Sequence, residues 1–179
     1  MQTLLRFTQG VDWLTEQIGQ ALKWLVLAAT LVCAGNALYR YGFSNSSNAW
    51  LEVQWYMFGA MFLLGAGYAL KHEEHVRVDI FFSRLTPQQQ AWVDVIGGVL
   101  FLMPVAILIA WLSIPMVINS YNIHEMSSDA GGLLRWPVKL LIPLGFGLLA
   151  LQGVSEIIKK LAIARGVIQP GKAYEKPVQ

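Results

Sequence analysis

The sequence has few charged residues for its length. Asp, Glu, Lys and Arg make up 13% of its 179 residues, whereas roughly 25% is usual in soluble domains. Hydrophobic residues make up 55%, and they gather in long apolar runs separated by short polar segments. So few charges cannot cover a water-facing surface, and the pattern predicts a chain that spans a membrane.

The small net charge and the single cysteine exclude other classes of protein. The net charge is only +2, and no run of Lys or Arg is interleaved with aromatic residues, so nucleic acid is not an expected partner. Cys33 is the only cysteine, which excludes an internal disulfide and leaves no second soft ligand for a metal. Its position within an apolar run predicts a small residue in the helix core.

The middles of the apolar runs also lack ionisable residues. A carrier or pump needs such a group facing a cavity near the middle of the membrane. The notable polar residues there are amides, which more often form hydrogen bonds between helices: Asn36, Gln54, Asn119 and Gln152. No catalytic set of Ser, His and Asp or of Cys and His is expected on one face, so we predict that the chain is not an enzyme.

Three histidines raise the question of a metal or haem site, because two of them are three residues apart and can share a helix face. His72 and His75 are expected on one side of the membrane and His124 on the other. They cannot meet, so no metal, haem or other cofactor is expected.

Four apolar segments are long enough to cross a bilayer as helices. The expected spans are residues 24–39, 50–70, 92–121 and 136–155. The sequence therefore predicts an all-α integral membrane protein with four transmembrane helices in a single domain, residues 1–179.

The third of these helices has a clear start. Thr86 is suited to the N-cap, Pro87 to the first helical position, and Gln89 to closing a capping box. The pattern continues to about Asn122, or roughly 54 Å of helix against a hydrocarbon core of about 30 Å. This helix must tilt, kink or protrude, and Pro104 and Pro115 are candidate kinks.

Three segments flank the spans. Residues 1–21 have the period of an amphipathic helix, which lies on the membrane surface, leads obliquely into the first span, or packs on a partner protein. Asp12 and Glu16 make this segment unlike a cleavable signal peptide, so the N-terminus is expected to be retained. The charged residues 71–85 are predicted to form an interfacial element, and residues 160–179 a basic tail.

The distribution of positive charge predicts the orientation. With four spans, the N-terminus, the segment between the second and third spans, and the tail share one side. Ten of the 13 Lys and Arg residues fall on that side, and the other side holds only Arg40, Arg135 and Lys139. Positive residues gather on the cytoplasmic side, so both termini are predicted in the cytoplasm.

Small residues recur along the apolar runs and let helix backbones approach closely. They are Ala28, Ala29, Ala34, Gly35, Gly59, Ala60, Gly65, Ala66, Gly67, Gly97, Gly98, Gly145 and Gly147. Packing within the bundle is their default role. Four spans nevertheless offer more such faces than an isolated bundle needs, which indicates a larger partner.

Several motifs together resemble a known family. Arg40, Trp50, Glu52 and Gly65-Ala66 precede the sequence His75-Val76-Arg77-Val78-Asp79, and the last span, Pro137 to Gln152, contains Pro143-Leu144-Gly145-Phe146. With the length and the four spans, this pattern resembles the small membrane subunit (DctQ-type) of tripartite ATP-independent periplasmic (TRAP) transporters.

The resemblance implies a sodium-coupled importer of an organic acid in the bacterial cytoplasmic (inner) membrane. In this family a soluble periplasmic binding protein delivers the substrate to a large membrane subunit that carries the sodium and substrate sites. The small subunit is then a non-catalytic scaffold. Two alternatives stay open: a self-sufficient small transporter or channel that oligomerises, and a membrane-bound haem or quinone protein.

The resemblance also implies contact residues. Those expected to contact the large subunit or lipid headgroups are Arg40, Glu52, His75, Arg77 and Asp79. They could equally be ordinary boundary charges, and Glu52 lies near a helix N-terminus, where a carboxylate is tolerated. The side that docks the binding protein is expected to include the tip at residues 44–48 and His124, Glu125, Asp129, Arg135 and Lys139. Residues 127–139 resemble the subgroup that handles monocarboxylates or 2-oxo acids.

Overall fold

The computed structural model describes residues 2–44, 47–73 and 85–167. Within them the chain forms helices α1 (Gln2–Phe43), α2 (Asn48–Lys71), α4 (Pro87–Gly97), the π-helical turn η1 (Gly98–Leu102), α5 (Met103–Asn122) and α6 (Trp136–Ala164). Because α4, η1 and α5 are continuous, these segments make four helices long and apolar enough to cross a membrane. The all-helical prediction is confirmed. The membrane boundaries along each helix stay predictions.

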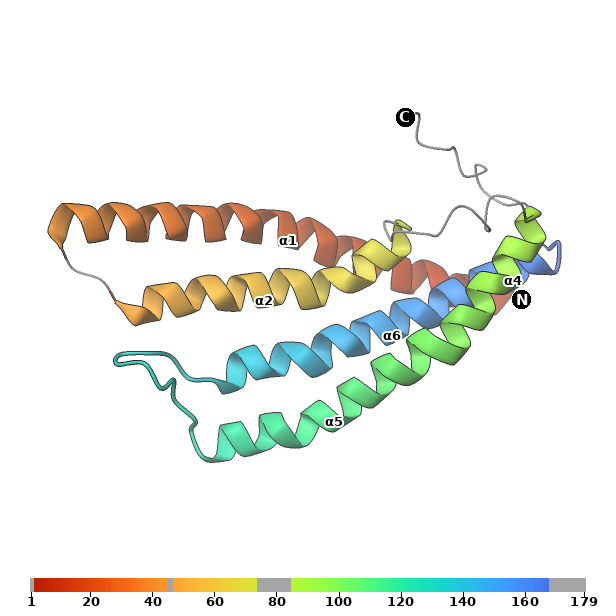
Figure 1. Cartoon of the computed structure of the whole chain (residues 1–179). Coiled ribbons are helices and arrows are strands. Elements are labelled where there is room, and N and C mark those ends of the chain that lie inside the picture. Colours follow the sequence, from red (N-terminus) through yellow and green to blue (C-terminus); the bar gives the residue numbers. More distant parts are fainter. Residues whose placement is uncertain (1, 45–46, 74–84, 168–179) are drawn as a thin grey trace.

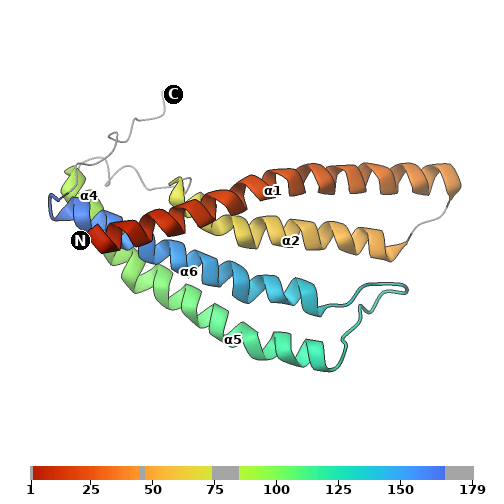
Figure 2. The ribbon, with the colours of Figure 1, turned by 180° about the vertical axis from the view of Figure 1, so that it is seen from behind.

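The helices form an open row rather than a closed bundle (Figure 1). Helix α1 packs on α2, α2 packs on α6, and α6 packs on α5 and α4. The first part of α1 also crosses α6, as the view from behind shows (Figure 2). Within the described residues, α5 makes no comparable contact with α1 or α2. The row therefore leaves both outer helices covered on one side only.

Helix α1 is one continuous helix of 42 residues, so the N-terminal segment leads into the first span without a break. Its buried positions in this segment include two polar residues, Thr8 and Thr15, while the apolar Leu4 and Phe7 are exposed. Part of the polar side thus faces the protein, which differs from an amphipathic helix lying on the membrane surface.

The predicted start and end of the third helix are confirmed. Thr86 Oγ1 accepts a hydrogen bond from the Gln89 amide, and Gln89 Oε1 accepts one from the Thr86 amide at 3.0 Å, which completes the capping box. The helix ends at Asn122. Its irregularity is the π turn η1, just before Pro104, whereas α5 continues through Pro115. A π turn and a missing proline donor are both recognised causes of helix bending.

Some of the small residues lie at close helix contacts, as predicted. A Cβ on Gly145 of α6 would lie 2.7 Å from the Leu63 carbonyl oxygen of α2, and one on Gly98 would lie 2.9 Å from Ile157 Cγ1. These helices could not approach so closely with larger residues. In contrast, Gly35 and Gly147 face open space.

The prediction for Cys33 is wrong, because its side chain is exposed on the outer surface of the row. It lines a groove between α1 and α2 with Ala29, Phe58 and Phe62. In a row of four helices an apolar position need not be a core position, because lipid or a partner can cover it.

Candidate functional site

The loop between α5 and α6 folds back on itself at the end of the row where α1 ends and α2 begins (Figure 1). Met126 and Leu134 form an antiparallel bridge. The Ser127 amide donates to the Leu133 carbonyl at 2.9 Å, and the Arg135 amide donates to the Glu125 carbonyl at 2.8 Å. These bonds hold residues 123–135 as a narrow loop with Asp129 exposed near its tip.

Glu52 of α2 fastens this loop to the helices. Its carboxylate accepts hydrogen bonds from Ser127 Oγ and from the Leu133 amide, the latter at 2.6 Å. Arg135 lies 3.6 Å from the same carboxylate and donates to Ser127 Oγ at 2.9 Å. Glu52 is only 2% exposed, so its charge is compensated by these partners rather than by water. We call Glu52, Ser127, Leu133 and Arg135 the loop clamp.

Further contacts tie the loop to α2 and α6. Tyr56 OH donates to the Leu134 carbonyl at 2.7 Å, and Asn48 Nδ2 donates to the Ala130 carbonyl at 3.0 Å. Lys139 of α6 forms an ion pair with Glu125. The Lys139 ammonium, as the largest influence, holds the pKa of the Glu125 carboxyl below its usual value. The loop is therefore attached along its length.

The structure brings together residues that the sequence assigned to two different surfaces. Glu52, expected at a lipid or subunit contact, shares one set of interactions with Arg135 from the docking side, and Glu125 and Lys139 pair beside them. His124 and Asp129 are exposed on the same loop.

Other predicted contact residues stand apart from this group. Arg40 is exposed in the last turn of α1 and forms no ion pair within the described part of the chain. His75, Arg77 and Asp79, with most of the predicted interfacial element, lie outside the described residues.

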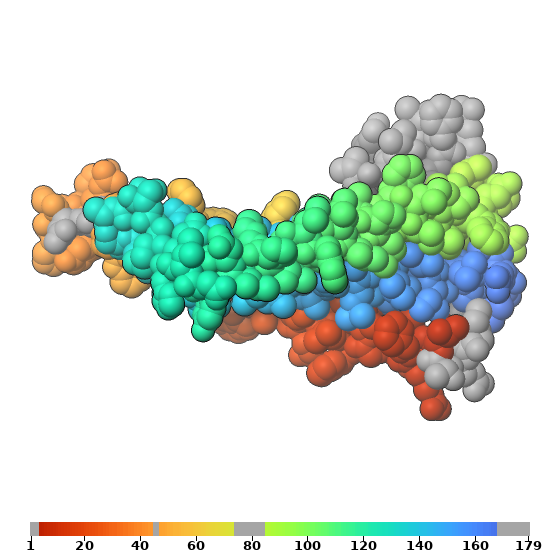
Figure 3. All heavy atoms as spheres, turned by 90° about the horizontal axis from the view of Figure 1, so that it is seen from below, coloured from red at the N-terminus to blue at the C-terminus, as the bar shows by residue number. Residues whose placement is uncertain are grey.

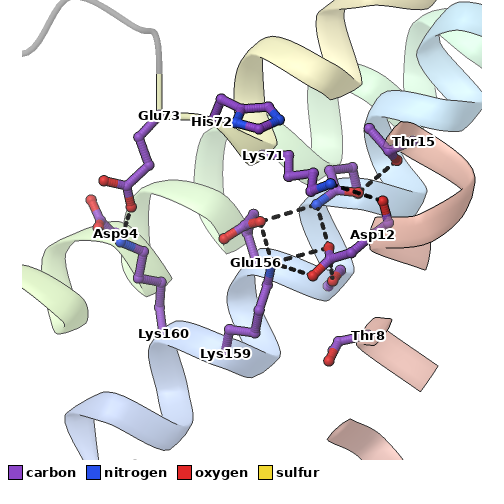
Figure 4. Close-up of polar contacts among 12 residues, drawn as sticks. Thr8, Asp12, Thr15, Lys71, His72, Glu73, Asp94, Glu156, Lys159 and Lys160 are labelled. Carbon is purple, nitrogen blue, oxygen red and sulfur yellow. Dashed lines mark hydrogen bonds and ion pairs between the residues drawn. The ribbon is translucent and has the colours of Figure 1, made fainter. Parts of the chain in front are cut away.

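A second polar cluster lies at the opposite end of the row and joins α1 to α6 (Figure 4). Lys159 Nζ lies 3.0 Å from both carboxylate oxygens of Asp12 and 2.5 Å from Glu156 Oε1. Gln152 accepts from Thr15 Oγ1 at 2.7 Å and donates to Asp12 at 2.9 Å. We call this cluster the α1–α6 network; it comprises Asp12, Thr15, Gln152, Ser155, Glu156 and Lys159.

Helix α2 joins the α1–α6 network from the side. Lys71 Nζ donates to the Asp12 carbonyl at 3.0 Å and to Glu16 Oε2 at 2.6 Å, and His72 Nε2 lies 3.2 Å from the same Glu16 oxygen. Nearby, Lys160 of α6 pairs with Asp94 of α4 at 3.2 Å and also with Glu73 (Figure 4). Helices α1, α2, α4 and α6 are thus linked by charges at this end.

Sequence reasoning predicted one member of the network and missed the others. Gln152 was expected to hydrogen-bond between helices, and this is confirmed; it is fully buried. Asp12 had been placed on a polar helix surface. A usable signal existed, because Asp12 and Thr15 are three residues apart on α1, while Gln152, Glu156 and Lys159 recur at spacings of four and three on α6.

Most charged groups of the described helices lie at the two ends of the row, and Lys23 of α1 lies between them. Within the described residues, the interiors of α2, α5 and α6 carry no Asp, Glu, Lys, Arg or His between these ends, whereas α1 carries Lys23, which donates a hydrogen bond to Gln20. The carboxylates of Asp12 and Glu52 are already paired within the chain. Such an arrangement fixes helices and a loop in place.

Four helices that are long and apolar enough to cross a membrane define a multi-pass helical membrane protein. The family model of the tripartite ATP-independent periplasmic transporters, DctQ component, matches residues 29–162. The chain belongs to this family and is the small subunit of a TRAP transporter, as the sequence motifs predicted. No curated protein and no solved structure matches it. The match includes the loop clamp but begins after Asp12 and Thr15.

Proposed function

We propose that this chain is the non-catalytic scaffold subunit of a sodium-coupled TRAP transporter that imports an organic acid across the bacterial inner membrane. The observation that carries the proposal is that the interiors of α2, α5 and α6 hold no Asp, Glu, Lys, Arg or His between the two polar clusters, in which Glu52 and Asp12 are already paired. A sodium or substrate site needs polar ligands along a transport path. Because the chain belongs to the DctQ family, the transport system that this scaffold would serve is a TRAP transporter.

The proposed orientation places both termini in the cytoplasm and the loop clamp in the periplasm. In this arrangement residues 123–135 help dock the substrate-binding protein, with His124 and Asp129 exposed toward it. The loop clamp supports the docking role because it presents the loop in one conformation, which reduces the ordering cost of binding. Arg40, His75, Arg77 and Asp79 remain proposed contacts to the large subunit or to lipid headgroups.

Reconstitution of the separate components tests the proposal. Liposomes would contain the large subunit alone, this chain alone, or both. The binding protein is added outside, and the sodium concentration is higher outside than inside. We expect uptake of the organic acid only when both membrane subunits are present, because neither the scaffold nor the unsupported large subunit suffices.

Two results would contradict the proposal. Full uptake by the large subunit alone, in a complex of normal stability, would show that the scaffold is dispensable. Uptake by this chain alone would instead favour the self-sufficient oligomeric transporter.

A further inference from the structure

Lys23 of α1 is a cation without a carboxylate partner. Its Nζ donates to Gln20 Oε1 at 3.1 Å, and the side chain forms no ion pair within the described part of the chain. The side chain is exposed on the surface of the row. An ammonium group has three donors and no acceptor, so two of its N–H groups remain for an acceptor outside the chain.

The position of Lys23 makes this lack of an anion costly. Glu16 pairs with Lys71 in the last turn of α2. Seven residues separate Glu16 from Lys23, which is about 10 Å of helix. Lys23 therefore lies farther along the row than the polar clusters, on a helix long and apolar enough to cross a membrane. A charge in this zone of a bilayer is unfavourable unless an anion lies close to it.

The Lys23 side chain reaches back toward the end of the row. Gln20 Nε2 donates to Glu16 Oε1 at 3.0 Å, so Glu16, Gln20 and Lys23 form a chain of hydrogen bonds along one side of α1. Side chains of a helix lean toward its N-terminus, and a lysine uses this lean to bring its charge to lipid headgroups. The adjacent Trp24 is 74% exposed, and tryptophan gathers at the level of the headgroups.

An apolar groove between α1 and α2 begins one turn beyond Lys23. Its volume is about 520 Å³, and its lining includes Val26, Thr30 and Cys33 of α1 with Phe58 and Phe62 of α2. Val26 and Thr30 follow Lys23 by three and seven residues, so they lie on the same side of the helix. The Thr30 hydroxyl already donates to the Val26 carbonyl. A cation followed by an apolar groove matches the order of phosphate and acyl chain in a phospholipid.

The opposite edge of the row has no comparable cation. Helices α4 and α5, with η1 between them, form one continuous curved ridge along the molecule (Figure 3). Residues 95–122 of this ridge contain no Asp, Glu, Lys, Arg or His. Its large exposed side chains, such as Trp111 and Leu112, suit contact with lipid tails but cannot hold a headgroup. The combination of cation and groove therefore distinguishes the α1–α2 edge from an ordinary lipid-facing surface.

We propose that Lys23 and this groove bind one phospholipid with a net negative headgroup. Lys23 Nζ donates to the phosphate, and one acyl chain lies in the groove against Val26 and Phe62. A net negative lipid is favoured because the chain itself leaves the charge of Lys23 uncompensated. The inference does not depend on the scaffold function, since it requires only that α1 and α2 cross the membrane.

Native mass spectrometry of the full chain in mild detergent tests the proposal. Dioleoylphosphatidylglycerol, which is negative, and dioleoylphosphatidylcholine, which is zwitterionic, are titrated separately. We expect preferential binding of phosphatidylglycerol, weakened by about fivefold or more in Lys23→Gln and retained in Lys23→Arg. Arg165→Gln is the matched control, because Arg165 is an exposed cation at the end of α6 without an ion pair in the described residues; it should leave the affinity unchanged.

The groove is tested separately from the cation. Cys33→Trp places a large side chain in the groove and should weaken phosphatidylglycerol binding. Leu38→Trp changes an exposed residue of the same helix that does not line the groove, and it should have no effect. Glycerol 3-phosphate carries a phosphate without acyl chains, so it should not displace the lipid at equal concentration. Displacement by glycerol 3-phosphate would overturn the role of the groove.

Other outcomes would overturn the lipid site. Equal losses in Lys23→Gln and Arg165→Gln would show a diffuse attraction of negative lipid, and equal binding of phosphatidylcholine would contradict the requirement for negative charge. If Lys23→Gln kept its lipid but bound the large subunit more weakly, the anion would be a carboxylate of that subunit. Thermal unfolding controls for misfolding: without lipid, Lys23→Gln should unfold at the midpoint of the parent chain, and phosphatidylglycerol should raise the midpoint of the parent chain more.

Discussion

Glu52 illustrates how one buried carboxylate can determine the position of a whole loop. Replacing it by Leu removes the acceptor for Ser127 Oγ and the Leu133 amide and leaves Arg135 without its ion-pair partner. We expect Glu52→Leu to speed hydrogen exchange at the Leu133 amide by about tenfold or more, because the loss frees a protected donor. Hydrogen-exchange mass spectrometry on the complete transporter in detergent measures this directly.

Asp129 provides the control for Glu52, because it is an exposed carboxylate near the tip of the same loop. Asp129→Asn should leave exchange at Leu133 unchanged. Equal effects of the two substitutions would mean that loop charge, rather than the loop clamp, orders these residues.

The Glu125–Lys139 pair gives the loop a dependence on pH. The pKa of Glu125 is lowered below its ordinary value of 4.5 by Lys139, so the folded loop favours the ionised form. The stabilisation is complete above pH 4.5 and is lost as the pH falls through the lower pKa of the folded state. Spin-label mobility at Ser128→Cys, in a Cys33→Ser background, should be constant near neutral pH and rise only below 4.5.

A variant without the pair checks this assignment. Lys139→Gln removes the charge that lowers the pKa of Glu125, so the loop should already be more mobile at neutral pH. Its mobility should change little on acidification. A rise in mobility as large as that of the parent chain would assign the transition to another group.

Contacts between individual side chains could not be predicted from the sequence, because the two partners lie far apart along the chain. Glu52 lies 75 residues from Ser127, and Asp12 lies 147 residues from Lys159. No local spacing encodes such pairs. Glu52 was therefore explained by its helix N-terminus, and Asp12 by an exposed polar face.

At the scale of elements, the contact between α2 and α6 depends on one missing side chain. Gly145→Ala would place a Cβ 2.7 Å from the Leu63 carbonyl oxygen, so the helices must move apart. We expect a loss of about 1–3 kcal/mol in the free energy of unfolding, measured by denaturation in mild detergent. Gly147→Ala is the matched control on the same helix, since its Cβ meets nothing within 4 Å; it should be neutral or slightly stabilising.

The α1–α6 contact depends on Gln152 in a comparable way. Gln152→Leu removes the bonds to Thr15, Asp12 and Glu156, and we expect it to lower the free energy of unfolding by about 1–2 kcal/mol. Asn119→Leu changes an exposed amide on α5 and should have little effect. Similar losses in both variants would indicate a general effect of removing amides from the spans.

Sequence patterns within a few residues predicted where the helices lie better than they predicted what each helix packs against. The capping box at Thr86 and the helix end at Asn122 depend on neighbours within a few residues, and both are confirmed. The polar residues near the start of α1 repeat with a helical period whether water, lipid or α6 covers them. Periodicity therefore predicted a helix there but did not identify what its polar side contacts.

The order of the helices across the whole molecule could not be predicted from composition. All four spans are apolar around most of their circumference, so hydropathy does not distinguish a side that faces another helix from one that faces lipid. The order α1, α2, α6, α5 rests instead on close contacts such as Gly145 with Leu63 and on the polar clusters.

An open row should gain much of its stability from its partner. A protein that binds only the folded state stabilises it by mass action, and here the partner would cover faces that the row leaves bare. We expect the midpoint of thermal unfolding of this chain to rise by about 5 °C or more in complex with the large subunit. An unchanged midpoint in a complex that stays intact would show that the row is stable by itself.

Helices α1 and α2 differ in length, and we therefore expect bilayer thickness to affect how the helices tilt. The 42 residues of α1 and the 24 of α2 correspond to about 63 Å and about 36 Å of helix, against a hydrocarbon core of about 30 Å. Helix α2 can adjust to shorter acyl chains by leaning. Lys71 at the end of α2 donates hydrogen bonds to the Asp12 carbonyl and to Glu16, so α1 must tilt together with α2. Membrane thickness would then change the tilt of the whole row.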